Sequence, residues 1–177
     1  MSLDLLFPHF DTLIRTPEDV ARLNEAILAL AVRGKLTPQD PSDEPASELL
    51  KRIRAEKRRL VKEGKLQEPK PLPPISSTDR PFDLPEGWVW SRLGNLIELE
   101  YGKGLPQKAR ADEGNVPVYG SNGIVGYHSE ALVDSPCVVV GRKGSSGAVN
   151  LSPVACWVID TAYYVLAPIG TDLVFLF

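Results

Sequence analysis

Residues 116–147 read VPVYGSNGIVGYHSEALVDSPCVVVGRKGSSG, and this stretch decides the fold of the second half of the chain. The runs VPVY and IVGY flank the tetrapeptide at residues 120–123, whose Asn-Gly pair favours the tight turn of a β-hairpin. The run CVVV at residues 137–140 is apolar throughout and too short for a helix, so it predicts a buried strand. The segment therefore predicts strands that end in polar, glycine-containing turns.

The first of these turns carries Ser121 and Asn122. An asparagine amide can pair with adenine through two hydrogen bonds, and a serine hydroxyl can reach a base or a phosphate, so the tip is chemically suited to DNA. Tight turns select the same residue types for their own geometry. A purely structural role for this turn therefore stays open.

The second turn, GRKGSSG at residues 141–147, carries two cations and two hydroxyls among its glycines. Backbone amides and serine hydroxyls can contact phosphate oxygens, and Arg142 can also read guanine. The spacing is not that of a Walker loop, because no Gly-Lys-Ser/Thr follows four intervening residues after a glycine. A phosphate-binding enzyme that uses this loop is retained as a third hypothesis, tested by nucleotide binding.

Two further segments adjoin these turns. The sequences VACWVID and TAYYVLA predict two more strands around Asp160, and the turn at residues 159–161 offers a third contact. Upstream, YGKGLPQKAR at residues 101–110 carries several cations and is too rich in glycine and proline for regular structure.

The first half of the chain predicts two helices. Thr16 is a capping residue with Pro17 at the first helical position and Asp19 three residues on, and Gly34 stops the helix. Its apolar stripe consists of Val20, Leu23, Ile27, Leu30 and Ala31. A second helix, expected from near Asp43, follows a short Pro-bearing turn, which suggests a helical hairpin or corner. The apolar face of this helix consists of Ala46, Leu49, Leu50, Ile53, Leu60 and Val61.

The second helix carries eight lysines and arginines between residues 51 and 65 against two glutamates. Such a charge run is usually a solvated face, with long side-chain stems covering apolar edges. A docking face for an acidic subunit or for phosphates is the alternative interpretation.

Six of the nineteen residues from Glu68 to Glu86 are proline, which predicts an extended spacer and a domain boundary. The following segment, LPEGWVWSRLGNL, alternates Trp88 and Trp90 as in a short strand that leads into a helix or a second strand. Core anchoring is the expected role of the two indoles, and stacking on a base is the alternative.

The composition of the chain limits the classes of function that can be expected. A net charge of −3 and a pI of 5.5 argue against nucleic-acid binding through a bulk positive field, so any DNA contact must come from local loops or need other subunits.

Cys137 and Cys156 lie in apolar surroundings and predict buried free thiols. His9 and His128 fit no catalytic set, so an enzyme is not expected. No apolar run reaches the length of a membrane span and the first residues are acidic, which predicts a cytoplasmic protein.

In their order along the chain, FDTLIRTPEDVARLNEAILALAVRGKL, LPEGWVWSRLGNL, VPVYGSNGIVGYHSE, VVVGRKGSSGAV and CWVIDTAYYV resemble the specificity subunits of type I restriction-modification systems. The resemblance implies a non-catalytic subunit that reads half of a split DNA site with each of two target-recognition domains. It implies double-stranded DNA, DNA methyltransferase (modification) subunits and restriction/translocase subunits as partners. S-adenosylmethionine, ATP and Mg would belong to those partners, with no cofactor in this chain.

The resemblance also indicates which residues would contact DNA and which would contact partner subunits. The DNA-binding candidates are Lys103, Gln107, Lys108, Arg110, Tyr119, Ser121, Asn122, Tyr127, Arg142, Lys143, Ser145 and Ser146. The partner-binding candidates are Leu23, Ile27, Leu30, Leu50, Ile53, Arg54 and Arg58. A family member would continue beyond TDLVFLF, so we expect a fragment that binds DNA weakly on its own.

The expected architecture is α+β. Residues 1–67 form a helical scaffold, residues 68–86 a proline-rich spacer, and residues 87–177 a partial, mostly antiparallel target-recognition domain with short helices. The competing hypothesis is a protein-interaction module whose helices dock a partner and whose glycine-rich half is structural.

Overall fold

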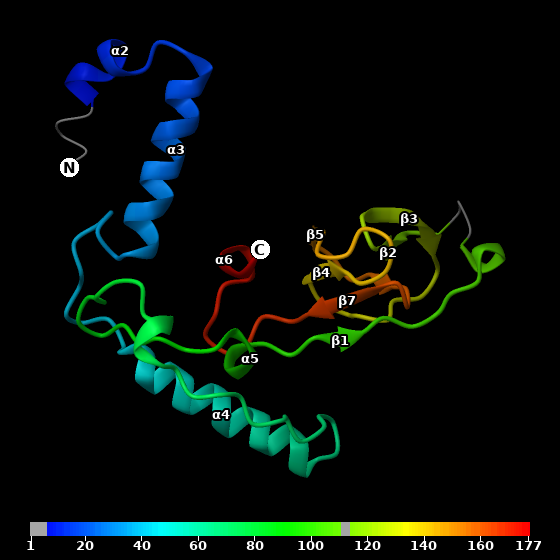
Figure 1. Cartoon of the computed structure of the whole chain (residues 1–177). Coiled ribbons are helices and arrows are strands. Elements are labelled where there is room, and N and C mark those ends of the chain that lie inside the picture. Colours follow the sequence, from blue (N-terminus) through cyan, green and yellow to red (C-terminus); the bar gives the residue numbers. More distant parts are fainter. Residues whose placement is uncertain (1–6, 111–113) are drawn as a thin grey trace. The chain divides into compact units, whose positions relative to one another are not determined.

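The computed structural model of the chain describes residues 7–110 and 114–177 and has the expected α+β class (Figure 1). The chain divides into two compact units. Unit 1 comprises Met1–Glu48 and Pro74–Trp90, and unit 2 comprises Leu49–Pro73 and Ser91–Phe177.

Unit 1 is built around the helix α3 (Pro17–Val32), which follows the 3-10 turn η1 (Phe7–His9) and the short helix α2 (Phe10–Leu13). The predicted capping box is present, since the Thr16 hydroxyl accepts from the Asp19 amide and the Asp19 carboxylate accepts from the Thr16 amide. Gly34 has a φ of 62° and ends the helix as predicted. The apolar stripe of α3 is half-buried except at Val20, which is exposed.

The two tryptophans contact other loop residues of unit 1, with Trp88 exposed and Trp90 half-buried. The indole Nε1 of Trp88 donates to the side-chain oxygen of Gln39 at 2.8 Å, and Trp90 lies 4.9 Å from the Phe82 ring between ring centroids. The short turn η2 (Ser77–Asp79) precedes them. No strand forms at Trp88 and Trp90, so that expectation was wrong, because both indoles pack against loops of unit 1 rather than joining a sheet.

In unit 2, the C-terminal part of α4 (Ala46–Lys62) packs on the short helix α5 (Leu93–Leu96). The helix begins three residues after the predicted start and buries Ile53. The ammonium of Lys57 donates to the Glu98 carboxylate at 2.6 Å and to the carbonyls of Gly94 and Ile97 at 3.1 and 3.2 Å. A lysine with a 14% exposed side chain thus ties α4 to the residues around α5.

Replacing Lys57 with methionine should lower the free energy of unfolding by about 2 kcal/mol, because it removes a charge-assisted network and leaves Glu98 without its cation. Lys62→Met is the matched control, since the Lys62 ammonium has no hydrogen bond to a described residue, and it should change stability by less than about 0.5 kcal/mol. Urea unfolding of both variants checks this. Equal effects would mean that Lys57 does not hold α4 in place.

The rest of unit 2 consists of two small sheets. One has the order β1-β7-β4-β5, from the strands β1 (Glu100–Tyr101), β7 (Ala162–Val165), β4 (Cys137–Gly141) and β5 (Val149–Ser152), and all its pairs are antiparallel. The other has the order β3-β2-β6, in which β2 (Val116–Gly120) pairs antiparallel with β3 (Gly123–His128) and parallel with β6 (Trp157–Val158). The predicted, mostly antiparallel β region is therefore confirmed.

Successive side chains of β2 point to opposite faces of its sheet, so this strand contributes to two clusters of buried residues. Tyr119 faces one cluster of buried residues, with Val139 of β4 and Ala162 of β7, so this cluster joins the two sheets. Val118 faces the other, together with Leu105 and Ile159. The segment that includes the turn η3 (Gln107–Ala109) therefore covers the outer face of the second sheet.

Two buried thiols complete the first cluster. Cys137 and Cys156 are free and fully buried, and their sulfurs lie 3.5 Å apart, as the apolar surroundings predicted. The hydrogen bond with Cys156, reinforced by burial, raises the pKa of the Cys137 thiol, so this group stays protonated.

Other expectations differ from the structure. Tyr101 belongs to β1 and the 3-10 turn η3 forms at Gln107–Ala109, within a segment where no regular structure was expected, because Leu105 inserts into the core and orders it. Residues 68–73 belong with α4 and residues 74–86 with unit 1, so the unit boundaries do not fall at residues 67 and 86. The helices α3 and α4 both exist, but most of α4 belongs to the other unit, so their packing as a hairpin stays a prediction.

Candidate nucleic-acid interface

Three loops of unit 2 meet at one end of the sheets, and we call them the loop cluster. They are the β2–β3 turn at residues 121–122, the β4–β5 loop at residues 142–148 and the β6–β7 turn at residues 159–161. The Thr161 carbonyl joins them, because it accepts from the amides of Arg142 and Lys143 at 2.9 and 3.0 Å and lies 2.7 Å from the Ser121 hydroxyl.

The Ser121 hydroxyl also faces the Lys143 carbonyl. A hydroxyl has one proton to donate, so it can bond only one of these two carbonyls at a time. The side chain is therefore occupied in holding the three loops together, and the structural interpretation of Ser121 gains support. Asn122, next to it, is exposed at the tip.

The predicted hairpin forms with a different turn from the one that Asn-Gly pairs favour. Ser121 and Asn122 both have negative φ, and the positive φ of 107° falls on Gly123, which already pairs with Gly120. The register shifts between Val118 and Tyr119, where a bulge bends the hairpin. The turn is thus built without the two positive φ values of a type I′ turn.

Gly141 permits the closest approach in the loop cluster. A Cβ atom at this position would lie 2.1 Å from the Ser145 carbonyl oxygen and 2.5 Å from the Ser121 carbonyl oxygen. Since both neighbours are backbone atoms, only glycine fits without moving a loop. The β2–β3 turn and the β4–β5 loop are therefore side by side, facing the same end of the sheets, as the DNA-contact hypothesis requires.

Arg142 is held by the β6–β7 turn and two aromatic rings. Its guanidinium donates to the Asp160 carbonyl through Nη2 at 2.6 Å and Nε at 3.2 Å. It also lies 5.4 Å from the Tyr101 ring centroid and 5.8 Å from that of Tyr163, within cation–π range. The arginine is thus pre-positioned at the rim of the cluster, with other guanidinium donors remaining for a ligand.

The rings of Tyr101 and Tyr163 meet edge to face at 4.9 Å. A hydrogen bond with the Tyr101 side chain raises the pKa of the Tyr163 hydroxyl above its usual value. Tyr163 is therefore neutral at neutral pH and adds no negative charge beside Arg142. Tyr101 is 65% exposed, so the pair forms an aromatic wall at the edge of the loop cluster.

The exposed charge of the cluster is mainly positive. The Lys143 ammonium lies 3.7 Å from the Asp160 carboxylate, and both side chains are more than half exposed, so this ion pair is weak and easily exchanged for another anion. Ser145 and Ser146 are exposed beside it. This arrangement can offer hydroxyls, an ammonium and a guanidinium to a polyanion.

The remaining DNA-contact candidates divide between two places. Lys103 lies near the loop cluster, since its amide donates to the Val158 carbonyl at 2.9 Å and its carbonyl accepts from Trp157 Nε1 at 2.9 Å. Gln107, Lys108 and Arg110 lie on or after η3, over the outer face of the second sheet. Arg110 is moreover engaged with the Leu105 carbonyl, at 2.8 Å from Nη2.

The two tyrosines of the hairpin are not in the loop cluster. Tyr119 is only 6% exposed and belongs to the core, so its side chain is not available to DNA. The reason is that β2 is the central strand of its sheet and is covered on both faces. Tyr127 is exposed but pairs with Pro117, at the end of the hairpin remote from the turn.

A model of the type I restriction modification DNA specificity domain matches residues 85–177, which include the whole loop cluster. The chain belongs to this family. The match covers both sheets and α5, and residues 7–84 lie outside it.

Two relatives from Escherichia coli show how much of the family protein this chain spans. The type I restriction enzyme EcoAI specificity subunit is 65% identical over 94 residues, which are 53% of this chain and 16% of the relative. The EcoEI specificity subunit is 57% identical over 89 residues, which are 50% of this chain and 15% of the relative. The match therefore spans about a sixth of these specificity subunits.

Solved structures of specificity subunits are also similar. The HsdS subunit from Thermoanaerobacter tengcongensis matches at 18% identity with a TM-score of 0.44, covering 88% of this chain and 36% of the other. The S subunit from M. genitalium matches at 21% identity with a TM-score of 0.41, covering 46% of this chain and 22% of the other.

The predicted partner-binding residues of this family member are distributed over both units. Leu23, Ile27 and Leu30 are half-buried on α3 in unit 1. On α4, Leu50 is half-buried and Ile53 is only 2% exposed, so Ile53 serves the core and is not available to a partner. The prediction failed for Ile53 because a core position and a docking position give the same apolar stripe.

Sequence reasoning did not single out the Tyr101–Tyr163 wall. Both tyrosines are visible in YGKG and TAYYV, but nothing in their spacing showed that β1 and β7 pair and bring them together. Among the described residues, no group of three or more His, Cys, Asp or Glu side chains is arranged to hold a metal ion. None of the helices in residues 7–110 and 114–177 has the length and apolar character needed to cross a bilayer.

Proposed function

We propose that this chain is the sequence-recognition part of a specificity subunit of a type I restriction-modification complex, and that the loop cluster contacts one half of a split DNA site. The observation that supports this most directly is the meeting of three polar loops at the Thr161 carbonyl, inside the region that the specificity-domain family covers. Strands fix the loops, and the loops carry the contacts.

Each residue of the cluster has a role in this proposal. Asn122 reads a base edge, for which a side-chain amide suits adenine. Arg142 exchanges one of its bonds to Asp160 for the paired acceptors of a guanine. Lys143, Ser145 and Ser146 contact phosphates and so fix the register of the subunit on the duplex. Lys103 adds a further phosphate contact from the segment that follows β1.

Catalysis resides on partner subunits in this proposal. The chain directs DNA methyltransferase subunits, which use S-adenosylmethionine, and restriction/translocase subunits, which use ATP and Mg, to the site that it selects. The modest net charge of −3 fits this division, because the partners can supply much of the contact with the DNA backbone.

The proposal is tested by the binding preference of the chain, assembled with its modification subunits, over a library of randomised duplexes at fixed salt. Replacing Asn122, Lys143 and Ser145 together with alanine should abolish the base preference in the half-site that the loop cluster contacts. Alanine at Arg15, Lys35 and Lys65 is the control, since these three exposed cations lie outside both the loop cluster and the cation-lined cavity beside α4. An unchanged preference after the loop substitutions would exclude the loop cluster as the reading surface.

A further inference from the structure

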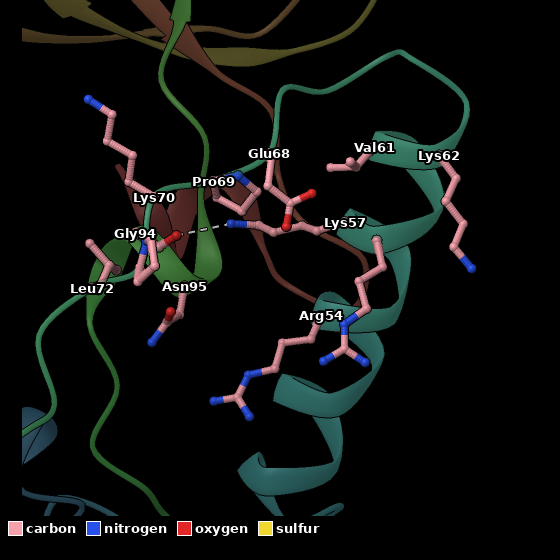
Figure 2. A pocket seen from close by; sticks show the side chains of 12 residues that line it. Arg54, Lys57, Val61, Lys62, Glu68, Pro69, Lys70, Leu72, Gly94 and Asn95 are labelled. Atoms are coloured by element: carbon pink, nitrogen blue, oxygen red, sulfur yellow. Dashed lines mark hydrogen bonds between the residues drawn. The ribbon is translucent and has the colours of Figure 1, made fainter.

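A second surface of unit 2 is lined by cations and apolar side chains and has no role in the DNA-recognition proposal. A cavity of about 340 Å³ lies between the C-terminal half of α4 and the proline-rich residues 68–72, with Gly94 and Asn95 of α5 among its lining residues (Figure 2). Five cations line it, namely Lys57 and four residues that we call its rim, Arg54, Arg58, Lys62 and Lys70. We call this surface the basic groove.

The cations of α4 from Arg54 onward fall into two groups. Arg59 is neutralised by Glu56 and Glu63 at 2.6 and 2.7 Å, and Lys57 is neutralised by Glu98. Arg54, Arg58 and Lys62 make no ion pair with any residue in the described part of the chain. They follow one another at intervals of four residues, so their Cα atoms rise about 6 Å at each step along one side of the helix.

The groove has one acidic lining residue, Glu68, against the four cations of its rim. Lys57 also lines it, but Figure 2 shows its ammonium directed across the cavity to the Gly94 carbonyl, where it is already bonded. The rim therefore carries an excess of positive charge that no ion pair within residues 7–110 and 114–177 neutralises.

Part of the lining of the groove is apolar. Val61 of α4, Leu72 and the two prolines at residues 69 and 71 are among its lining residues. A Cβ atom on Gly94 would lie 3.0 Å from Leu72 Cδ1, so Leu72 packs directly on α5 and fixes this wall. A lining of aliphatic side chains and proline rings suits an apolar side chain better than it suits phosphate oxygens.

The groove and the loop cluster lie at opposite ends of β7. The strand begins at Ala162, next to the Thr161 carbonyl of the cluster, and residues 166–169 beyond its other end line a cavity with Ile53 and Leu60 of α4. Figure 1 shows β7 running from the loops toward α5 and α4. A ligand of the basic groove is thus distinct from the bases that the loops would read.

We propose that the basic groove docks an acidic polypeptide segment of a partner subunit, in which carboxylates flank at least one aliphatic or aromatic side chain. The carboxylates pair with Arg54, Arg58 and Lys62, and the apolar side chain enters between Val61 and Leu72. This proposal rests on the proposed function for the existence of a partner subunit. The charge run on α4 then has a role beyond that of a solvated face.

The test is carbodiimide cross-linking of the full chain assembled with its modification subunits, without DNA. This reagent joins an ammonium to a carboxylate in contact, so peptides should be found that link Lys62 or Lys70 to aspartates or glutamates of a partner. Lys35 is the control, since it is exposed and makes no ion pair with a described residue, and it should give no such link. Links to Lys35 but not to Lys62 or Lys70 would overturn the proposal.

A charge reversal completes the test. Arg58→Glu should weaken assembly about 10-fold and reduce its salt dependence, whereas Lys35→Glu, with the same change in net charge, should leave both unchanged. The variant should keep its helix, because Arg54 and Lys62 lie four residues on either side of the new glutamate. Unaltered assembly with weaker duplex binding would instead make the groove a phosphate site and refute the docking proposal. Since assembly is measured without DNA, this result is independent of whether the loop cluster reads bases.

Discussion

Replacing Gly141 with alanine should lower the free energy of unfolding of unit 2 by about 3 kcal/mol and reduce site-specific DNA binding at least 100-fold. The new methyl group would lie 2.1 Å from the Ser145 carbonyl oxygen and 2.5 Å from that of Ser121, so the β4–β5 loop or the β2–β3 turn must move. Forcing an atom into a packed site commonly costs about 1–3 kcal/mol, and here the obstructing atoms are backbone. Urea unfolding and duplex binding by the assembled complex check the two effects.

Gly144→Ala is the matched control for this prediction. Gly144 lies in the same loop with a φ of 77°, but a Cβ atom there would meet nothing within 4 Å. Its substitution should cost only about 1 kcal/mol of backbone strain and leave the loops in place. If Gly141→Ala were no worse than Gly144→Ala in both measurements, the two loops would not be packed together as described.

Replacing Arg142 with alanine should lower the affinity for the recognised duplex about 30- to 100-fold and that for an unrelated duplex less than about 5-fold. A bidentate contact to guanine contributes about 1–3 kcal/mol of discrimination, whereas the loss of one charge affects all sequences alike. Arg142 is already oriented by Asp160, Tyr101 and Tyr163, so little conformational entropy is lost when it binds. Competition binding at one salt concentration measures both affinities.

Two further variants separate a base contact from a structural role. Arg142→Lys keeps the charge but not the planar fork of donors, so we expect most of the loss of discrimination to remain. Lys108→Ala removes one charge on η3, away from the loop cluster, and should have little effect on discrimination. An equal loss of affinity for both duplexes in Arg142→Ala would assign this arginine to a phosphate.

The sequence predicted those parts of the fold that local chemistry determines. The capping box at Thr16, the stop at Gly34 and the hairpin around residues 121–122 follow from residues close in the chain, and all three are present. The strand at Cys137 is also present, because an apolar run of this length has few alternatives in a β region. Local signals of this kind agree with the final fold wherever packing does not override them.

Other features of the fold depend on contacts between residues that are distant in the sequence, and the sequence did not predict them. Trp88 and Trp90 alternate as in a strand but are used for packing in unit 1, and Tyr119 resembles a turn-edge residue but lies in the core. The aromatic wall beside Arg142 exists only because β1 pairs with β7 across more than sixty residues. The sequence therefore indicated which loops carry the candidate contacts, but not which side chains the fold leaves free.

The most direct test of the central claim, that the loop cluster reads bases, is photo-cross-linking from position 122. A photoreactive amino acid in place of the exposed Asn122, in the full chain assembled with its modification subunits, should cross-link to one or two base positions within one half of the recognised site. It should give no defined cross-link on an unrelated duplex. Cross-links distributed evenly along both duplexes, or absent from the recognised site while assembly is intact, would contradict the claim.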